Sequence, residues 1–347
     1  MAPLLELRHV TKAYGRGLFS RQHTVALEDF SITIDTQSAS ITAVVGESGS
    51  GKTTLASLLL GEIEPTKGEV LYKGKSLQAL SGEERSAFRR DVQVIFQDPF
   101  EVYNPFYRVD HVLEVPIRKF GLARTRKGIR AIAEEALRTV GLRPEDTLGR
   151  YPHQLSGGQR QHIMVARALL LKPKLIIADE PVSMIDASLR ATVLSNLRQL
   201  NQEFGISFLY ITHDLATAYQ ISENIIVLYA GSVAEAGDVD LVVQQPQHPY
   251  TQLLIGSIPL PDPAQRWHAN ADLTPSGGAS ASRTGCHFAN RCPQVMSKCR
   301  GAAPALYHSD PHRLVACYLQ EAAPAIDSRE LASVFVSAAR PVTAQPT

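Results

Sequence analysis

The 347-residue sequence has no excess of charge of either sign, because 35 Lys and Arg residues nearly balance 34 Asp and Glu residues and leave a formal net charge of +1. So small a net charge gives no strong field toward nucleic acid or an anionic membrane, and we predict no nucleic-acid partner. No apolar run approaches the ~20 residues that span a bilayer, so no transmembrane segment is predicted. The first residues lack a charged stretch before a long apolar core, and we expect no secretion signal.

Cysteine is scarce, and none of the four residues precedes Cys286. Cys286, Cys292, Cys299 and Cys317 are separated by five, six and seventeen residues, without the C-x₂-C pairs of zinc knuckles. In a reducing compartment this cluster favours a metal site over two disulfides. Four thiolates can hold one zinc ion or one [4Fe–4S] cluster, and free thiols are a third possibility. The nearby His287 and His308 are predicted to be surface residues.

Strands and helices alternate along most of the chain. Apolar residues make up 44% of the sequence, which is enough for a sizeable core, and the length suggests about two domains. Short β segments are predicted in residues 1–35, buried strands over 40–46, 174–179, 207–212 and 225–230, and helices over 52–60, from 157 and over 189–204. Residues 98–165 are predicted to be mostly helical. The alternation predicts an α/β fold with a mainly parallel sheet.

The composition changes after about residue 237. Residues 259–285 hold several prolines and a Ser/Gly/Ala run, which is typical of a flexible connection. The last residues are rich in Ala, Val and Pro, and we expect a loose tail there.

A phosphate-binding loop is predicted between the strand over 40–46 and the helix that follows. Residues 46–53 fit the pattern G-x-x-x-x-G-K-[ST], in which glycines turn backbone N–H groups inward to form an anion nest. Lys52 can reach the β/γ oxygens of a nucleotide, and the Thr53 hydroxyl can ligate Mg²⁺. A chance glycine-rich turn is the alternative, and the strand–loop–helix context disfavours it. The predicted binding residues are Gly46, Glu47, Ser48, Gly49, Ser50, Gly51, Lys52, Thr53 and Thr54.

Two carboxylates follow the strand over 174–179. Ligands of parallel sheets bind at the carboxyl ends of the strands, where Asp179 and Glu180 would lie. We predict that Asp179 holds Mg²⁺ and that Glu180 orients and deprotonates the attacking water. An acidic pair at the start of a loop is common in isolation, and the upstream phosphate loop favours the catalytic interpretation.

A second anion-binding element opens the next helix, with Ser156, Gly157, Gly158 and Gln159 at its start. The serine hydroxyl and the free N–H groups of a helix start can bind phosphate. The first loop already surrounds its own nucleotide, so this element is predicted to complete a site on another subunit. Taken alone, an N-cap serine with flexible glycines explains the same residues.

In this set of motifs the sequence resembles the ATP-binding-cassette (ABC) ATPases from residue 3 to about 235, because Leu-Ser-Gly-Gly-Gln at 155–159 matches that family's hallmark. The resemblance implies a P-loop fold with a parallel core sheet, an antiparallel β part and a helical subdomain at about 98–165. It also implies that Gln97 contacts Mg²⁺ and that His213 contacts the γ-phosphate. Asp186 would cross a dimer interface, and Tyr14 would stack on adenine.

Within this family the sequence resembles the oligopeptide/dipeptide/nickel importer branch, on Gln97-Asp-Pro99 with Asn104-Pro105, Tyr151-Pro-His153, His248-Pro-Tyr250 and the cysteine-bearing extension. The resemblance implies an ATPase that powers import of peptides or a related small solute. It implies ATP and Mg²⁺, and a [4Fe–4S] cluster in preference to zinc. Its partners would be a paralogous or identical ATPase subunit, two membrane permease subunits and an extracytoplasmic solute-binding protein, and its place the cytoplasmic face of the cell membrane.

The predicted boundaries are a cassette over 3–237, a C-terminal extension over 238–322 and a flexible tail over 323–347. A soluble ABC ATPase of repair, translation or cluster assembly is the alternative function. Against it, no long coiled coil is visible, and the chain has a single cassette. A nucleotide-gated module with redox-sensing cysteines is a third, non-enzymatic reading.

Overall fold

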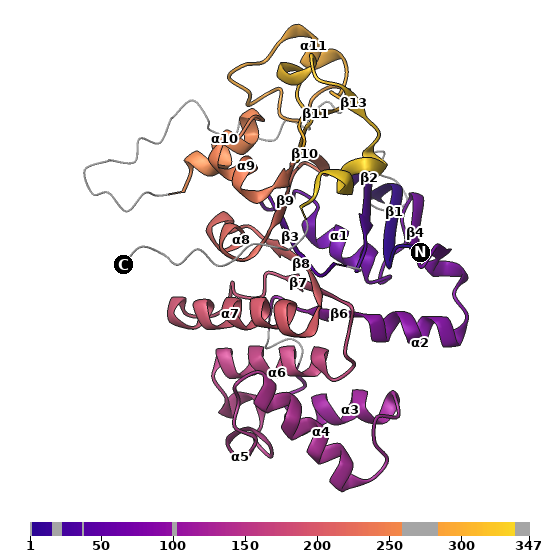
Figure 1. Ribbon diagram of the computed structural model, residues 1–347, viewed down its shortest axis with the longest axis vertical. Helices are drawn as coiled ribbons and strands as arrows, with labels where there is room; N and C mark the ends of the chain where they lie inside the picture. Colours follow the sequence, from indigo (N-terminus) through magenta and orange to yellow (C-terminus); the bar gives the residue numbers. More distant parts are fainter. Residues whose placement is uncertain (1, 16–22, 37, 99–102, 259–283, 337–347) are drawn as a thin grey trace, which may run out of the picture. The chain divides into compact units, whose positions relative to one another are not determined.

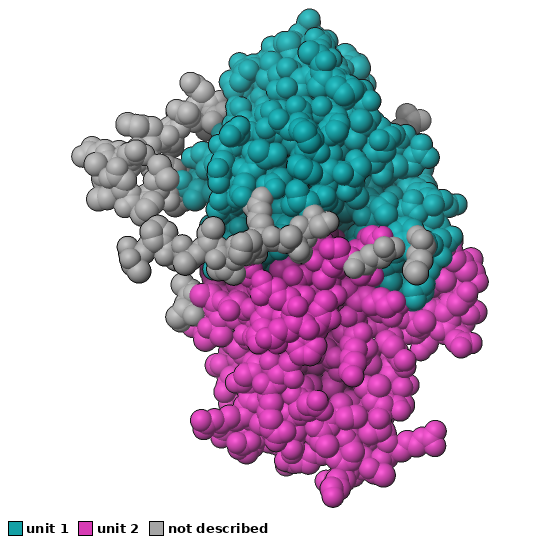
Figure 2. Space-filling view, in the orientation of Figure 1, with its two compact units in different colours: residues 1–34, 42–74, 213–347 teal, residues 35–41, 75–212 magenta. Residues whose placement is uncertain are grey.

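The computed structural model describes residues 2–15, 23–36, 38–98, 103–258 and 284–336. Two compact units emerge, shown in teal and magenta in Figure 2. Unit 1 comprises residues 1–34, 42–74 and 213–347, and unit 2 comprises residues 35–41 and 75–212. The predicted connection over 259–285 falls almost wholly outside the described residues, and so do Pro99 and the end of the predicted tail.

Unit 1 contains an antiparallel sheet in the order β2-β1-β4, built from β1 (Leu5–Gly15), β2 (His23–Ile34) and β4 (Lys67–Tyr72). Its other strands follow the order β13-β11-β12-β10-β9-β3. Their bounds are β3 Ile41–Val45, β9 Asn224–Tyr229, β10 Ser232–Asp238, β11 Leu306–Asp310, β12 Arg313–Val315 and β13 Ala325–Ile326. β3 and β9 are parallel (Figure 1). The other neighbours in this order, from β9 through β10, β12 and β11 to β13, pair antiparallel.

The helices of unit 1 are short. Their bounds are α1 Lys52–Leu59, α8 Leu215–Ile221, α9 Val239–Gln244, α10 Pro249–Gly256, α11 Ser297–Gly301, η4 Tyr318–Gln320 and η5 Ser328–Val334. α1 ends before Gly61, whose φ of 66° only glycine adopts without strain, as the sequence predicts.

Unit 2 contains three parallel strands in the order β8-β7-β6 and most of the long helices. The strands are β6 Val92–Ile95, β7 Leu175–Asp179 and β8 Ser207–Thr212, and a short β5 covers Lys75–Ser76. The helices are η1 Leu77–Ala79, α2 Gly82–Asp91, α3 Asp110–Lys119, α4 Arg126–Thr139, α5 Pro144–Thr147, η2 Pro152–Gln154, α6 Gly157–Leu169 and α7 Ala187–Phe204. α3, α4 and α6 pack on one another, which confirms the predicted helical region (Figure 1).

The predicted α/β class, with parallel strands, an antiparallel β part and a helical subdomain, is confirmed. β3 and β8 are buried at every position, which explains their continuous apolar runs. No helix in the described parts of the chain is long and apolar enough to cross a bilayer.

The structure differs from the sequence prediction at the C-terminus. Residues 325–336 are not a loose tail, because β13 pairs with β11 and η5 packs against β2. Leu331 and Val334 of η5 are fully buried. The Ala/Val composition that resembles a tail therefore includes the apolar residues that attach this segment to unit 1.

Candidate active site

The predicted phosphate loop joins β3 to α1 in unit 1. Two of its glycines are required by close approach, because a Cβ on Gly46 would lie 2.2 Å from the Leu228 carbonyl oxygen and one on Gly51 would lie 2.3 Å from that of Ala26. Any side chain at these positions would displace backbone. The backbone thus explains why the motif needs glycine here.

Lys52 is buried at the start of α1, with only 7% of its surface exposed. Its ammonium donates hydrogen bonds to the carbonyl oxygens of Gly46 (2.7 Å) and Glu47 (3.0 Å). No acidic residue occupies the first turn of α1, so the positive end of the helix dipole is not neutralised there. Ser48, Gly49 and Thr53 are exposed around it. A lysine, a helix start and exposed loop N–H groups together form a site for an anionic ligand.

The predicted catalytic carboxylates lie in unit 2. β7 is buried from Leu175 to Ala178, and Asp179, its last residue, is partly exposed. Glu180 follows with a φ of 46°, a conformation that is strained for a residue with a side chain. Its N–H donates to the Ile211 carbonyl of β8 (2.8 Å), which holds this conformation. The strand therefore ends in a sharp backbone turn at Glu180.

Gln97, which follows the neighbouring strand β6, contacts Glu180. β6 pairs in parallel with β7, so the residues after Ile95 and Ala178 leave the sheet at the same edge. The Gln97 amide donates to Glu180 Oε2 at 3.1 Å. The structure thus brings together Gln97 and Glu180, which are 83 residues apart.

Ser156 caps α6 within its own chain. Its hydroxyl accepts from the Gln159 N–H (3.2 Å) and the Gln159 side chain accepts from the Ser156 N–H (3.0 Å), which makes a capping box. The serine is exposed, and no acidic residue follows in the first turn of α6. The capping explanation holds inside the chain, and the exposed helix start is also open to a ligand.

Ser50 of the phosphate loop is buried, whereas three further predicted site residues outside the loop are exposed. Asp186 is the exposed N-cap of α7 and makes no side-chain cap hydrogen bond. His213 is exposed directly after β8, and Asp214 beside it caps α8. Tyr14 at the end of β1 is 43% exposed, with the Lys12 ammonium 5.3 Å from its ring centroid.

The four cysteines line one small cavity, together with Phe288 and Met296. Burial raises the pKa of Cys286 and Cys292 and raises that of Cys317 to about 11, with a smaller contribution from the neighbouring sulfurs. Four converging thiols suit a metal cluster in number and chemistry. Among the described residues, however, no three His, Cys, Asp or Glu side chains stand in metal-binding geometry.

Two contacts with the phosphate loop were not predicted from the sequence. The Arg291 guanidinium forms a two-pronged ion pair with the Glu47 carboxylate, and the Tyr250 hydroxyl accepts from the Glu47 N–H at 2.9 Å. Tyr250 belongs to the His248-Pro-Tyr250 motif noted above, and Arg291 directly precedes Cys292 in the sequence, but neither position indicates a contact with the phosphate loop. His287 is also not a surface residue, because its side chain is only 9% exposed and its Nε2 lies 3.2 Å from Glu28 Oε2.

The fold and the loop define a P-loop nucleotide-binding protein. The family described as "ABC transporter" matches residues 27–183, and "Oligopeptide/dipeptide transporter, C-terminal region" matches residues 234–299. The chain belongs to the ATP-binding subunits of the ABC transporters, in the branch that carries this C-terminal region, and it is an ATPase.

Relatives and solved structures agree with this. The chain is 40% identical to "Putative oligopeptide transport ATP-binding protein YkfD" of Bacillus subtilis, over 91% of this chain and 95% of the relative. It is also 40% identical to "Oligopeptide transport ATP-binding protein OppF" of Escherichia coli, over 78% and 81%. Among solved structures it is similar to the dimeric ATP-binding cassette MJ0796 bound to ADP and Pi, with a TM-score of 0.59 and 30% identity over 68% of this chain and 98% of that one.

Proposed function

We propose that this chain powers the import of peptides or a related small solute by hydrolysing Mg-ATP at a head-to-tail dimer of cassettes. The observation that carries the proposal is the continuous similarity, across 91% of the chain, to a relative named for oligopeptide transport. The match to the oligopeptide/dipeptide C-terminal region supports it further, because that region follows the cassette in the same chain. A cassette over 3–237 and an extension over 238–322 are the proposed domains.

The partners in this proposal are a second ATPase subunit, identical or paralogous, two permease subunits and an extracytoplasmic solute-binding protein. The chain would then work at the cytoplasmic face of the cell membrane. The decisive experiment is affinity purification of the tagged full chain from its native membranes. Recovery of two multi-span proteins, with peptide-stimulated ATP hydrolysis after reconstitution, is expected. Recovery of a ribosome or DNA-repair assembly would instead support a soluble ABC ATPase.

In the proposed mechanism the phosphate loop binds the nucleotide, and Lys52 and His213 offset the charge that develops on the γ-phosphate. Glu180 takes the proton of the attacking water, and Gln97, which is hydrogen-bonded to Glu180, helps to orient it. Oxygen atoms of Thr53, Gln97 and Asp179 suit Mg²⁺, which supplies positive charge to the phosphates. Tyr14 would stack on the adenine.

The partner's cassette would complete each site. Ser156, Gly157, Gly158 and Gln159 lie at the start of α6, where Ser156 is exposed and Gly158 is buried, and the exposed serine fits contact with the γ-phosphate of a nucleotide held by the other subunit. Asp186, exposed at the start of α7, would cross the same interface.

For the cysteine cavity we propose a structural or redox-sensing [4Fe–4S] cluster held by Cys286, Cys292, Cys299 and Cys317. The convergence of the four thiols on one cavity supports it. Anaerobically purified protein should contain iron and sulfide in a 1:1 ratio, near four of each per chain. Cys299→Ser should lower both contents, and stoichiometric zinc in place of iron would overturn the proposal.

A further inference from the structure

A short segment of the C-terminal region, the cysteine-flanked segment (residues 286–292), contacts the phosphate loop directly. Arg291 Nη1 donates to Glu47 Oε2 at 2.9 Å, and Nη2 donates to Glu47 Oε1 at 3.0 Å. Two parallel hydrogen bonds between a guanidinium and a carboxylate fix direction as well as distance. The carboxylate of the second residue of the phosphate loop is therefore held from outside the cassette motifs.

The backbone of Glu47 is held by the same region. Its N–H donates to the hydroxyl of Tyr250, which is fully buried in α10. Phe288 packs edge-on against Tyr229, with ring centroids 5.2 Å apart, and against Tyr250 at 5.5 Å. The Arg291 guanidinium packs against this aromatic cluster, with its Cζ 5.6 Å from the centroid of the Phe288 ring. Well-packed aromatic rings leave the guanidinium little freedom to turn away.

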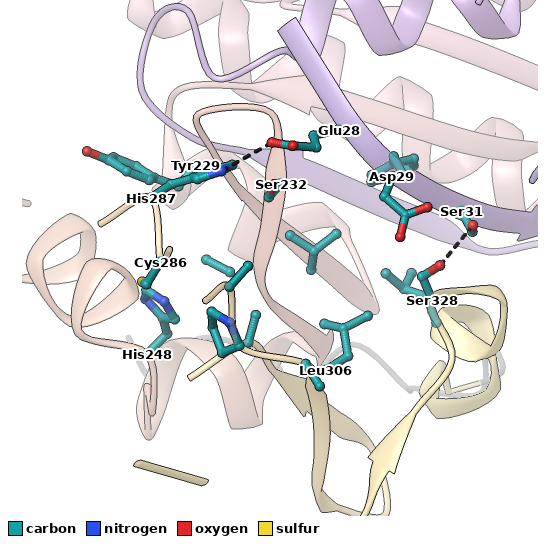
Figure 3. A pocket seen from close by; sticks show the side chains of 18 of the residues that line it. Glu28, Asp29, Ser31, Tyr229, Ser232, His248, Cys286, His287, Leu306 and Ser328 are labelled. Atoms are coloured by element: carbon teal, nitrogen blue, oxygen red, sulfur yellow. Dashed lines mark hydrogen bonds and ion pairs between the residues drawn. The ribbon is translucent and has the colours of Figure 1, made fainter. Parts of the chain in front are cut away.

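A second set of contacts connects the cysteine-flanked segment, through His287, to Ser50 of the phosphate loop. His287 points to Glu28 of β2, beside a cavity of about 480 Å³ that no phosphate-loop residue lines (Figure 3). The Glu28 N–H donates to the Gly231 carbonyl (2.8 Å), and the Gly231 N–H donates to the carbonyl of Ser50 in the loop (2.9 Å). The segment is thus connected to the phosphate loop at Glu47 and, through Glu28 and Gly231, at Ser50.

These contacts bear on nucleotide binding in two ways. The Glu47 carbonyl accepts from Lys52 Nζ, so a shift of Glu47 moves an acceptor of the lysine that is to meet the phosphates. The Glu47 carboxylate would also repel a bound phosphate chain, and the Arg291 guanidinium compensates that charge. A guanidinium stays protonated in proteins, so the compensating charge is permanent.

We propose that Arg291 is a positioning residue for the phosphate loop, and that through Glu47 the cysteine-flanked segment is part of the ATP-binding machinery. The proposal rests on the assignment of the phosphate loop as the ATP site. It predicts that the C-terminal region sets the affinity for ATP and leaves the chemical step unchanged.

The test is titration of the full-length chain with Mg-ATP in four forms: wild type, Arg291→Ala, Glu47→Gln and the double variant. Arg291→Ala should raise the dissociation constant about tenfold, because a carboxylate near the phosphates loses its compensation. In the Glu47→Gln background, adding Arg291→Ala should change the dissociation constant by less than about threefold, because Arg291 acts on the loop through the Glu47 carboxylate.

Three further measurements separate this role from a loss of structure. The melting temperature of Arg291→Ala should match that of Lys298→Ala, a control that removes an ion pair with Glu321 inside the C-terminal region. In steady-state hydrolysis, Arg291→Ala should raise the KM for ATP and leave kcat within about twofold. Arg291→Lys keeps the positive charge but cannot form the two parallel hydrogen bonds, so it should bind ATP with an affinity between those of wild type and Arg291→Ala.

Equal ATP affinity in wild type and Arg291→Ala, or an undiminished tenfold loss when Arg291→Ala is added to Glu47→Gln, would overturn the positioning role. Lys52→Ala gives the separate check on the site itself. If Lys52→Ala also bound ATP normally, the assignment of the phosphate loop would fail before that of Arg291.

Discussion

Glu180 combines a strained backbone with a fixed side chain. Its left-handed φ of 46° is held by the hydrogen bond from its N–H to Ile211, and its carboxylate accepts from Gln97. Strain of this kind costs about 1–3 kcal/mol and persists where the surrounding structure imposes it. The position and the conformation both fit the role of the base that activates water.

Glu180→Gln should reduce kcat at least about 100-fold, because an amide cannot take the proton of the attacking water. Binding of ATP should remain, since the phosphate loop is unchanged. Single-turnover hydrolysis and nucleotide titration measure the two effects. Glu203→Gln, at an exposed position of α7, is the matched control and should keep full activity. More than half of wild-type turnover in Glu180→Gln would remove Glu180 from the role.

His248 should make the C-terminal region sensitive to acid. Burial lowers its pKa from 6.5 to about 4, although a hydrogen bond with the backbone of Ala316 opposes this. Between these values the unfolded state binds more protons than the folded state, so the free energy of unfolding falls as the pH drops from 6.5 to 4. The loss is at most about 3 kcal/mol.

Urea titrations at pH 7 and pH 5 measure this loss. His248→Gln should be less stable at pH 7, because the Tyr250 N–H loses the ring nitrogen that accepts its hydrogen bond at 3.0 Å. Its stability should also depend less on pH over this range. Glu235, whose pKa burial raises, is present in both proteins, so the difference isolates the histidine. The same pH dependence in both would contradict the assignment.

At the scale of the element, two helices begin with the same capping box, but only one of them is also suited to bind a ligand. Ser81 caps α2 and Ser156 caps α6, each in a complete capping box. The sequence around Ser81 carries two acidic residues in the first turn of its helix, whereas α6 has none. Acidic residues repel an anionic ligand, so of these two helix starts only that of α6 is suited to bind phosphate.

Ser81→Ala and Ser156→Ala should each lower the stability of the protein by about 1 kcal/mol, the usual cost of losing an N-cap. Only Ser156→Ala should also lower ATP hydrolysis, by about tenfold, because it removes a hydroxyl offered to the partner's nucleotide. Chemical denaturation and steady-state hydrolysis of the assembled transporter supply both numbers. Equal activity in the two variants would show that Ser156 acts as a cap alone.

At the scale of the whole molecule, the last described segment of the chain packs against its first strands. η5 packs against β2 and β1, and the Ser328 hydroxyl lies 3.0 Å from that of Ser31. The contact spans 297 residues of sequence. Such a contact makes the C-terminal region part of the core of unit 1.

Leu331→Ala should therefore lower the free energy of unfolding by about 2–4 kcal/mol, the usual cost of truncating a fully buried leucine. The neighbouring exposed Glu330→Ala should change it by less than about 0.5 kcal/mol. Urea denaturation of the two variants compares them directly. A loss below about 1 kcal/mol for Leu331→Ala would mean that η5 contributes little to the core.

Local signals explain which predictions from the sequence were confirmed. The strand before Gly46, the helix from Lys52 and the capped start of α6 depend on glycine spacing, apolar runs and capping residues that lie within a few positions of one another. The fold class follows from the same patterns. The predictions of a loose tail, as far as residues 325–336 are concerned, and of a surface His287 were wrong, because burial of a short segment depends on what packs against it and not on its composition.

By itself, the sequence determined a P-loop cassette with a nucleotide loop and an acidic strand end, because these features are encoded by neighbouring residues. Only the tertiary structure decided that Arg291 and Tyr250 hold Glu47, from 244 and 203 positions away. A lone arginine or tyrosine carries no periodic signal. Its partner is chosen when β9, α10 and the cysteine-flanked segment pack together, which is a property of the folded chain.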